Sequence, residues 1–235
     1  MEDFLFENEK IKIYNYLMQG IHSSMYVMLD GELALIIDPN PREDALALLQ
    51  KKRVTDVTVY LTHEHFDHIA GVNRLRQYFQ THVICSRIAS ERITDSGKNL
   101  ARYWEVTMMD QPKEKWAEWE AMKDETYTCT ADEVFDGETE WDWHGHRIQA
   151  VPAPGHSPGS VVYFIDGLLF SGDSLVNGAG VICRLPGGSW KTYTEKTRPL
   201  IEALPGDTMV FPGHETPDTL NHLKKYLAKF GKVQE

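Results

Sequence analysis

The sequence predicts a layered α/β protein with mixed β-sheets. Two observations lead to this prediction. Strand-like and helix-like patterns mix along the whole chain, and hairpin signals occur beside segments that need a crossover connection. The chain has 235 residues, of which 42% are hydrophobic and 25% charged, so it is long enough to bury a full core. We therefore expect residues 1–235 to form a single domain.

The N-terminal third contains three kinds of element signal. Two apolar runs, 25–29 and 33–37, flank Asp30-Gly31, a dipeptide typical of hairpin turns. An amphipathic helix is predicted over 41–52, where proline stands at its start. The pattern then predicts a buried strand, a helix and another strand, over 57–61, 69–79 and 82–85 in that order.

The rest of the chain returns to strand signals after a segment of different texture. Residues 86–132 are rich in charge, have a helical pattern and contain large aromatics that include Tyr103, Trp104, Trp116 and Trp119. We interpret this segment as a helical insertion within the domain. Beyond it, strands are predicted over 147–151, 160–165, 168–171 and 208–211, and helices over 193–204 and 217–230.

Charge and composition exclude several classes of function. The formal net charge of −11 argues against a general nucleic-acid binder, which would need a basic surface. The N-terminus is acidic and lacks a secretory pattern, and no apolar run approaches the roughly 20 residues that span a bilayer. Three widely spaced cysteines, Cys85, Cys129 and Cys183, are typical of reduced thiols. We expect a cytoplasmic protein with a small-molecule substrate and with neither a nucleic-acid nor a membrane partner.

The strongest chemical signal is the run Thr62-His63-Glu64-His65-Phe66-Asp67-His68, which follows a predicted buried strand. Side chains two residues apart in an extended segment point the same way, so His63 and His65 can bind one ion. Asp67 shares that direction, and His68 lies at the turn into the helix, where it can face a neighbouring ion. Imidazole and carboxylate ligands suit zinc, iron or manganese. A lone histidine would be read as a core residue, but five candidate ligands within six residues indicate a metal site.

Three later positions have the same character. His156 lies in Gly155-His156-Ser157-Pro158-Gly159, Asp173 in Gly172-Asp173-Ser174, and His214 in Gly213-His214-Glu215. Each follows a predicted strand and a glycine that leaves room for close approach. Taken singly, each could be an ordinary turn residue. Together they place three more metal-type ligands at strand ends.

These motifs resemble the metallo-β-lactamase fold superfamily, and within it the glyoxalase II-like branch of dinuclear hydrolases. The resemblance also includes Asp38, in Ile36-Ile37-Asp38-Pro39, and covers about residues 20–215. It implies an αββα sandwich, in which two mixed β-sheets are flanked by helices and the metals lie at one edge. It also implies two divalent metal ions, with Zn²⁺ preferred and iron or manganese as alternatives.

The resemblance assigns a role to each motif residue. His63, His65 and His156 would bind the first metal, Asp67, His68 and His214 the second, and Asp173 both. Asp38 would orient the ligand block. Hydroxide held between the metals would attack a small ester, thioester or lactone, and Asp67 would steer this nucleophile as the catalytic residue.

Some features depart from known branches of the superfamily. Only 21 residues follow His214, too few for the helical extension that binds glutathione in true glyoxalase II. Asp173 and the missing signal argue against an exported β-lactamase, and Val176 stands where similar lactonases have tyrosine. The alternatives are a mononuclear iron sulfur dioxygenase that oxidises persulfides, a phosphodiesterase on the same scaffold, and a non-catalytic binding protein.

Other histidines and the tryptophans of the insertion have weaker signals. His144 and His146 are interpreted as residues of a hairpin turn, and His22 is expected near the mouth of the site. In this superfamily an insertion at 86–132 commonly covers the metals. Trp104, Trp116 and Trp119 are therefore either substrate-pocket residues or ordinary core aromatics.

Overall fold

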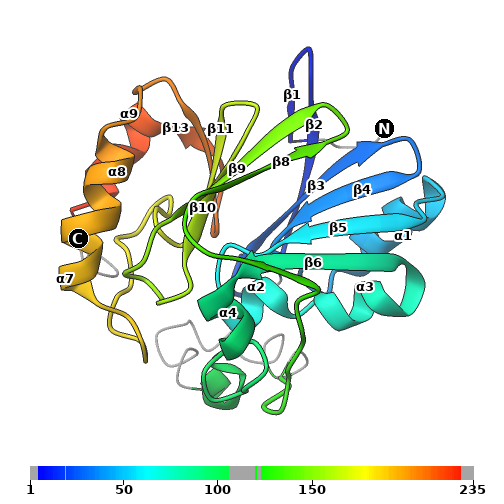
Figure 1. The fold of residues 1–235 in the computed structure, drawn as a ribbon, viewed down its shortest axis with the longest axis horizontal. Helices are drawn as coiled ribbons and strands as arrows, with labels where there is room; N and C mark the ends of the chain where they lie inside the picture. The colour runs from blue at the N-terminus through cyan, green and yellow to red at the C-terminus, as the bar shows by residue number, and fades with distance from the viewer. Residues whose placement is uncertain (1–4, 19, 106–119, 121–122, 229–235) are drawn as a thin grey trace.

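The computed structural model describes residues 5–18, 20–105, 120 and 123–228. Two β-sheets lie face to face, with helices on the outer face of each (Figure 1). Helices α1 (Glu43–Lys51) and α3 (Val72–Tyr78) cover the first sheet, whereas α7 (Trp190–Thr192), α8 (Arg198–Glu202) and α9 (Leu220–Leu223) cover the second. This is the four-layered αββα sandwich that the resemblance implied.

The described residues of the first sheet form seven strands. In spatial order they are β1 (Phe6–Glu7), β2 (Lys12–Leu17), β3 (Ser24–Asp30), β4 (Leu33–Ile37), β5 (Asp56–Tyr60), β6 (Gln80–Ser86) and β7 (Glu133–Phe135). Pairing is antiparallel from β1 to β4 and parallel from β4 to β7. The predicted hairpin at Asp30-Gly31 is therefore the β3–β4 turn, where Gly31 has a positive φ of 60°.

The second sheet has six described strands. Their spatial order is β13 (Asp218–Thr219), β12 (Met209–Pro212), β11 (Leu168–Gly172), β10 (Val161–Ile165), β9 (His146–Pro152) and β8 (Thr139–Trp143). Only β11 and β12 pair in parallel. His144 and Gly145 form the turn between β8 and β9, and both have positive φ. His144 was predicted in this turn, whereas His146, also predicted there, is the first residue of β9 and pairs with Trp143.

Three apolar layers explain how the sandwich holds together. The layer between the sheets contains Tyr26, Tyr60, Tyr163, Phe170 and Phe211, all less than 3% exposed. A second layer lies between the first sheet and its helices, and a third between the second sheet and α8 and α9. Because each sheet is covered on both faces, central strands such as β4, β10 and β11 are close to continuously apolar, which is why the sequence pattern marked them.

The described part of the predicted insertion packs into the core of the first sheet. It contains α4 (Arg87–Arg92), the short helix η1 (Ala101–Tyr103) and the segment 123–132 that leads into β7. Trp104 is 3% exposed, and its ring lies edge-on to Phe66 with a centroid distance of 4.9 Å. Of the two roles left open for Trp104, its burial matches core packing. Trp116 and Trp119 lie outside the described residues.

Several element boundaries differ from the sequence predictions. The helix predicted over 69–79 is split into α2 (Phe66–Ile69) and α3, and the helix predicted over 217–230 contains β13, α9 and the turn η4 (Lys224–Tyr226). The interruption between α2 and α3 contains Gly71, where an added Cβ would lie 2.6 Å from the Asn40 carbonyl oxygen. Among the described residues, every helix is too short or too polar to span a bilayer.

Candidate metal centre

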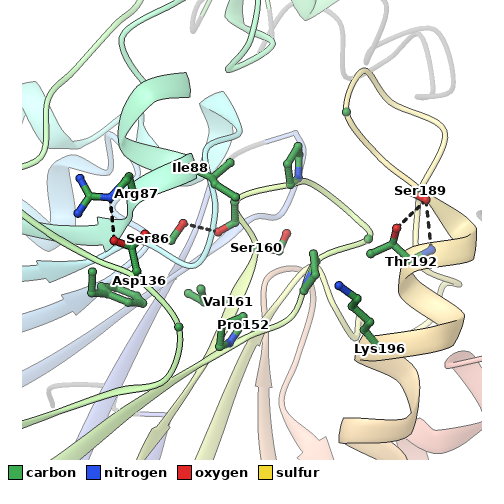
Figure 2. Close-up of a pocket in the computed structure, with 17 residues that line it drawn as sticks. Ser86, Arg87, Ile88, Asp136, Pro152, Ser160, Val161, Ser189, Thr192 and Lys196 are labelled. Carbon is green, nitrogen blue, oxygen red and sulfur yellow. Dashed lines mark hydrogen bonds and ion pairs between the residues drawn. The ribbon is translucent and has the colours of Figure 1, made fainter.

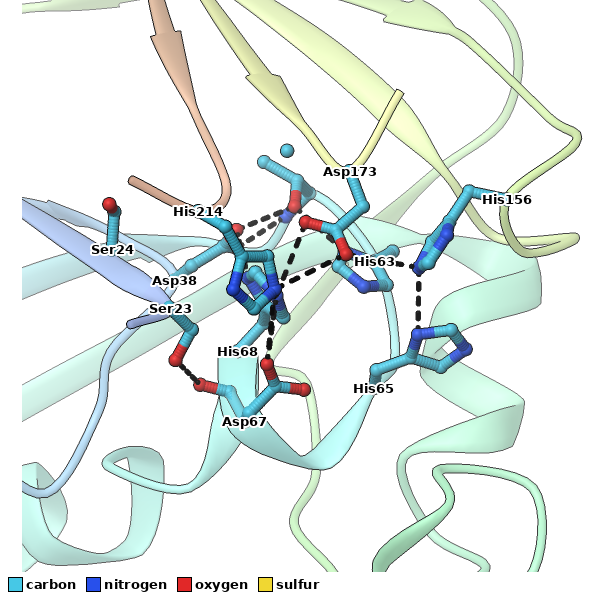
Figure 3. Close-up of polar contacts among 12 residues, drawn as sticks. Ser23, Ser24, Asp38, His63, His65, Asp67, His68, His156, Asp173 and His214 are labelled. Carbon is cyan, nitrogen blue, oxygen red and sulfur yellow. Dashed lines mark hydrogen bonds and ion pairs between the residues drawn. The ribbon is translucent and has the colours of Figure 1, made fainter. Parts of the chain in front are cut away.

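The site lies where the strands of both sheets end (Figure 3). The run 63–68 follows β5 in the first sheet. The second sheet supplies His156 from the β9–β10 loop, Asp173 directly after β11, and His214 after β12. All seven residues for which the resemblance implied metal binding are therefore brought to one edge of the sandwich.

Two groups of ligand-type atoms form within this cluster. His63, His65 and His156 offer atoms that all lie within 4.8 Å of one another, and so do Asp67, His68 and His214. Asp173 lies between the two groups. Its Oδ2 is 3.4 Å from Nε2 of His156 and 3.4 Å from Nε2 of His214, whereas its Oδ1 is 3.5 Å from Nε2 of His68.

The protein fixes which nitrogen of each ring faces the centre. His156 Nδ1 donates to the Ile182 carbonyl at 2.7 Å, and His214 Nδ1 donates to the Ile21 carbonyl at 3.0 Å. With Nδ1 protonated in both, the lone pair of each imidazole lies on Nε2, which points toward Asp173.

Asp38 fixes two further rings. Its Oδ2 accepts from His68 Nδ1 at 3.0 Å and from the Thr62 hydroxyl at 2.6 Å, whereas its Oδ1 accepts from the Thr62 amide at 2.7 Å. Because the Thr62 hydroxyl donates to Asp38, it accepts from His63 Nδ1, 3.0 Å away. Asp38 and His68 also fall within a third ligand-type group, but the carboxylate oxygens of Asp38 are already taken by these hydrogen bonds. Asp38 is thus a support for the histidines.

The cluster contains buried atoms that a cation would satisfy. His63 Nε2, His65 Nε2 and Asp173 Oδ1 are buried and have no hydrogen-bond partner. His65 Nδ1 lies 2.9 Å from His156 Nε2 and donates to its lone pair, so Nε2 is the His65 atom left without a partner. Leaving a buried polar atom unsatisfied costs about 1–3 kcal/mol. The donor set of imidazoles and carboxylates therefore fits divalent metal ions.

Electrostatics divides the histidines into two classes. Burial, together with neighbouring imidazoles, holds the pKa values of His63 and His65 well below the usual range, so both rings are neutral at pH 7. Burial also lowers the pKa of His68, but the carboxylates of Asp67, Asp173 and Asp38 outweigh it and hold that pKa well above the usual range. Without metal, His68 is thus held in its cationic form. Burial also lowers the pKa of His214, but the carboxylates of Asp173 and Asp67 outweigh it and raise that pKa.

This division predicts different proton release from the two groups. A metal ion that binds the Asp67–His68–His214 group competes with a proton for His68, because nearby carboxylates outweigh burial and hold the pKa of this histidine well above its usual range. An ion at the other group meets neutral rings. Affinity of the Asp67–His68–His214 group should therefore rise with pH until the raised pKa of His68 is passed. Calorimetric titration in buffers with different ionisation enthalpies measures this, and equal proton release from the two binding steps would contradict it.

Glycines let the strand ends approach the ligands. Gly172 has a φ of +48°, and a Cβ there would lie 2.4 Å from the Thr62 hydroxyl oxygen. A Cβ at Gly213 would lie 2.2 Å from Asp173 Oδ1. The sequence marked these glycines as room for close approach, and the structure shows which groups use that room.

Gly172→Ala is expected to lower the free energy of unfolding by about 2–5 kcal/mol, through the left-handed backbone and the clash with Thr62. The matched control is Gly31→Ala, which has φ +60° but open space around the new Cβ, and which should cost only about 1–2 kcal/mol. Urea unfolding of the metal-free proteins measures both losses. Equal losses would show that the contact with Thr62 is unimportant.

Two residues of the ligand run received no specific role from the sequence. The Thr62 hydroxyl links Asp38 to His63, because it donates to the first and accepts from the second. Glu64, one of the five candidate ligands, points away from both metal groups toward Arg92 and Ser157. The alternation of an extended segment places Glu64 opposite His63 and His65, and this signal was available in the sequence.

On one side of the cluster, three of the ligand-type side chains are partly exposed to solvent. Asp67 and Asp173 have side chains that are 12% exposed and His214 one that is 17% exposed, whereas His68 is fully buried. His22 lies beside this opening, where its Nδ1 is 3.3 Å from Glu215 Oε1. The structure thus opens the metal cluster to solvent on the side of Asp67, Asp173 and His214.

A separate cavity of about 430 Å³ lies on the far side of the His156 loop (Figure 2). Its walls come from Ser86 and Arg87 at the start of α4, from the loop 154–159, and from Thr192 and Lys196 of α7 and the π-helical turn η3 (Tyr193–Thr197). The seven ligand-type residues do not line it, and neither does Trp104.

Comparison with known proteins agrees with this architecture. Two of the curated proteins that are similar to the chain are described as hydrolases. A probable metallo-hydrolase, YqgX, from Bacillus subtilis (strain 168) is 26% identical over 200 residues, which cover 83% of this chain and 85% of the relative. A hydroxyacylglutathione hydrolase from Xanthomonas axonopodis pv. citri (strain 306) is 28% identical over 190 residues, which cover 80% of this chain but only 58% of that relative.

Solved structures show the same fold. The BLEG-1 B3 metallo-beta-lactamase superposes with a TM-score of 0.72 at 26% identity, covering 92% of this chain and 98% of that one. TTHA1623 in a di-iron-bound form superposes with a TM-score of 0.68 at 26% identity, covering 91% and 98%. The family model described as the metallo-beta-lactamase superfamily matches residues 18–214, which contain every residue of the cluster. The chain therefore belongs to the metallo-beta-lactamase superfamily.

Proposed function

We propose that the protein is a hydrolase that uses two divalent metal ions, with zinc preferred over iron or manganese, to cleave a small ester, thioester or lactone. The observation that carries this proposal is the position of Asp173. Its carboxylate contacts His156 of one group and both His68 and His214 of the other. A carboxylate shared between two sets of ligands suits a site that holds two metal ions.

The residues divide the work as follows. His63, His65 and His156 would hold one ion and Asp67, His68 and His214 the other, with Asp173 between them. When bound, such ions lower the pKa of water to about 7 and polarise the carbonyl of a substrate. Asp38 keeps His68 in the correct tautomer and orientation, and through Thr62 it does the same for His63.

Asp67 is proposed as the catalytic residue. Burial raises the pKa of Asp67, but the charge of His68 outweighs it and lowers that pKa to about 2, so the carboxylate is ionised at neutral pH. It lies at the solvent-exposed side of the cluster, and its Oδ2 is 3.4 Å from His214 Nε2. An ionised carboxylate at this place can accept a hydrogen bond from the attacking water and orient it toward a carbonyl.

The names of the relatives support hydrolysis and a two-metal site. One curated relative is described as a probable metallo-hydrolase and another as a hydroxyacylglutathione hydrolase. A solved structure at 26% identity is described as di-iron-bound. We propose a small molecule as the substrate because only a small part of the Asp67 and Asp173 side chains is exposed at the opening of the site.

Elemental analysis combined with a substrate panel tests the proposal. The purified protein is expected to carry about two metal ions per chain, to hydrolyse members of an ester, thioester and lactone panel, and to lose this activity after chelation. Phosphodiester substrates and oxygen uptake with persulfides belong in the same panel. One iron ion per chain with oxygen consumption would contradict the proposal and favour a sulfur dioxygenase.

A further inference from the structure

Glu64 is a fully buried carboxylate inside the ligand run that does not face the metal groups. In the extended segment 63–65, alternate side chains point to opposite sides, so Glu64 lies behind the two histidines that flank it. Its side chain has no exposed surface. Burying an ionised carboxylate is costly unless charged and hydrogen-bonding partners compensate.

Two side chains from distant parts of the chain provide this compensation. Arg92 Nε, at the end of α4, donates to Glu64 Oε1 at 2.5 Å. The hydroxyl of Ser157 donates to Glu64 Oε2 at 2.8 Å and lies 2.8 Å from the hydroxyl of Ser160. Glu64 therefore joins the ligand run to the loop that carries His156, because Ser157 is the next residue after this histidine.

Arg92 extends the connection to a third segment. Its terminal Nη2 donates to the Pro186 carbonyl at 3.2 Å and to the Lys98 carbonyl at 3.2 Å. Pro186 belongs to the same connection, 173–189, as Ile182, whose carbonyl holds His156 Nδ1. The ion pair thus bonds both the loop that carries His156 and the connection that carries Ile182.

The backbone around the ion pair is shaped for close contact. A Cβ at Gly159 would lie 2.5 Å from Glu64 Oε2, and a Cβ at Gly187, where φ is +96°, would lie 2.9 Å from Arg92 Nη2. Larger residues at these two positions would push the loops away from the pair. Both loops are therefore held against Glu64 and Arg92 without space for water between them and the charged atoms at these points.

We propose that Glu64 is a positioning residue, which through Arg92 and Ser157 sets the affinity of the His63–His65–His156 group for its metal ion. The three imidazoles come from two separate loops, and Glu64 is bonded to the loop that it does not belong to. Hydrogen-bonding partners behind metal ligands typically change metal affinity by about 10–100-fold. The inference rests on the proposed function only in taking this group as a metal site.

Metal-binding titrations against a competing chelator, with zinc as the probe, test this role. His156→Ala first identifies the binding step that belongs to the group. Glu64→Gln and Ser157→Ala are then expected to weaken that same step by about 10–100-fold, while the other step changes much less. Thermal unfolding of each metal-free variant is measured in parallel, so that a loss of stability is seen separately from a loss of affinity.

Asp132→Asn is the matched control. Asp132 also accepts from an arginine, Arg76, at 2.5 Å and from a second donor, the Val83 amide, but it contacts none of the ligand-type residues. Its substitution should leave both zinc-binding steps unchanged. If Glu64→Gln does not fold, the zinc affinity of Ser157→Ala tests the inference. This substitution removes only the hydroxyl that donates to Glu64 and leaves the buried ion pair in place.

Two results would overturn the inference. In the first, Glu64→Gln and Ser157→Ala lower the unfolding temperature but bind zinc with wild-type affinity. In the second, they weaken both zinc-binding steps equally. Either result would show that the ion pair is structural only. Substrate turnover plays no part in this experiment. A protein that binds zinc as expected but hydrolyses nothing in the panel would contradict the proposed function and leave the role of Glu64 intact.

Discussion

Replacing Asp173 with alanine is expected to lower the metal content from about two ions per chain to about one, and turnover by about a thousandfold or more. Asp173 is the one described carboxylate whose oxygens contact histidines of both groups. Without it, His68 and His214 lose an anionic partner that raises the pKa of both. The second ion would then be held by Asp67, His68 and His214 alone, without the shared carboxylate.

Metal analysis and steady-state kinetics measure these two effects. The matched control for Asp173→Ala is the same substitution at another carboxylate that contacts a histidine, Asp166→Ala. Asp166 also contacts a histidine, with Oδ2 2.6 Å from His146 Nδ1, but it lies at the β10–β11 turn, at the opposite end of β11 from Asp173. The control should retain metal and activity. A fully active Asp173→Ala protein with a single ion would refute the shared carboxylate.

Asp67→Asn is expected to reduce turnover by about 10²–10⁴-fold, the usual contribution of a proton-accepting group. The change keeps the size of the side chain and removes its charge. Its backbone carbonyl accepts from the Ser23 hydroxyl at 3.0 Å, a contact that the substitution leaves in place. The loop should therefore keep its shape.

Kinetics at saturating metal separate catalysis from metal loss for this variant. The metal content is determined on the same sample, so that a loss of turnover at full metal content is assigned to the missing carboxylate. Wild-type turnover in a fully metallated Asp67→Asn protein would exclude the role. His82→Ala provides a surface comparison, since His82 pairs with Glu133 on the exposed side of the first sheet.

The sequence predicted which side chains gather at the site better than it predicted the local structure around them. The candidate ligands were recognised by residue type and by the position of each residue after a strand, both of which are visible in the chain. The short strands β1, β7 and β13 were not predicted, because two or three residues carry no periodic pattern and their pairing depends on neighbouring strands.

The supports of the ligands were harder to predict, because they depend on contacts between distant segments. Asp38 was assigned through the resemblance, whereas the relay through Thr62 requires the hydroxyl to meet Asp38 and His63 together. Arg92 gave no signal, since its partner is Glu64, 28 residues away. The role of Trp104 also depended on tertiary packing, because aromatic spacing alone does not tell a core face from a pocket wall.

The origin of the ligands in both sheets affects when the protein can acquire metal during its synthesis. The run 63–68 belongs to the first half of the chain, but His156, Asp173 and His214 follow strands of the second half. During synthesis a ribosome-bound chain that has not yet emitted β12 lacks His214, so the Asp67–His68–His214 group does not exist. Since metal binding is coupled to folding of the segments that supply the ligands, an ion at this group would bind only after β12 has been synthesised and both sheets have docked.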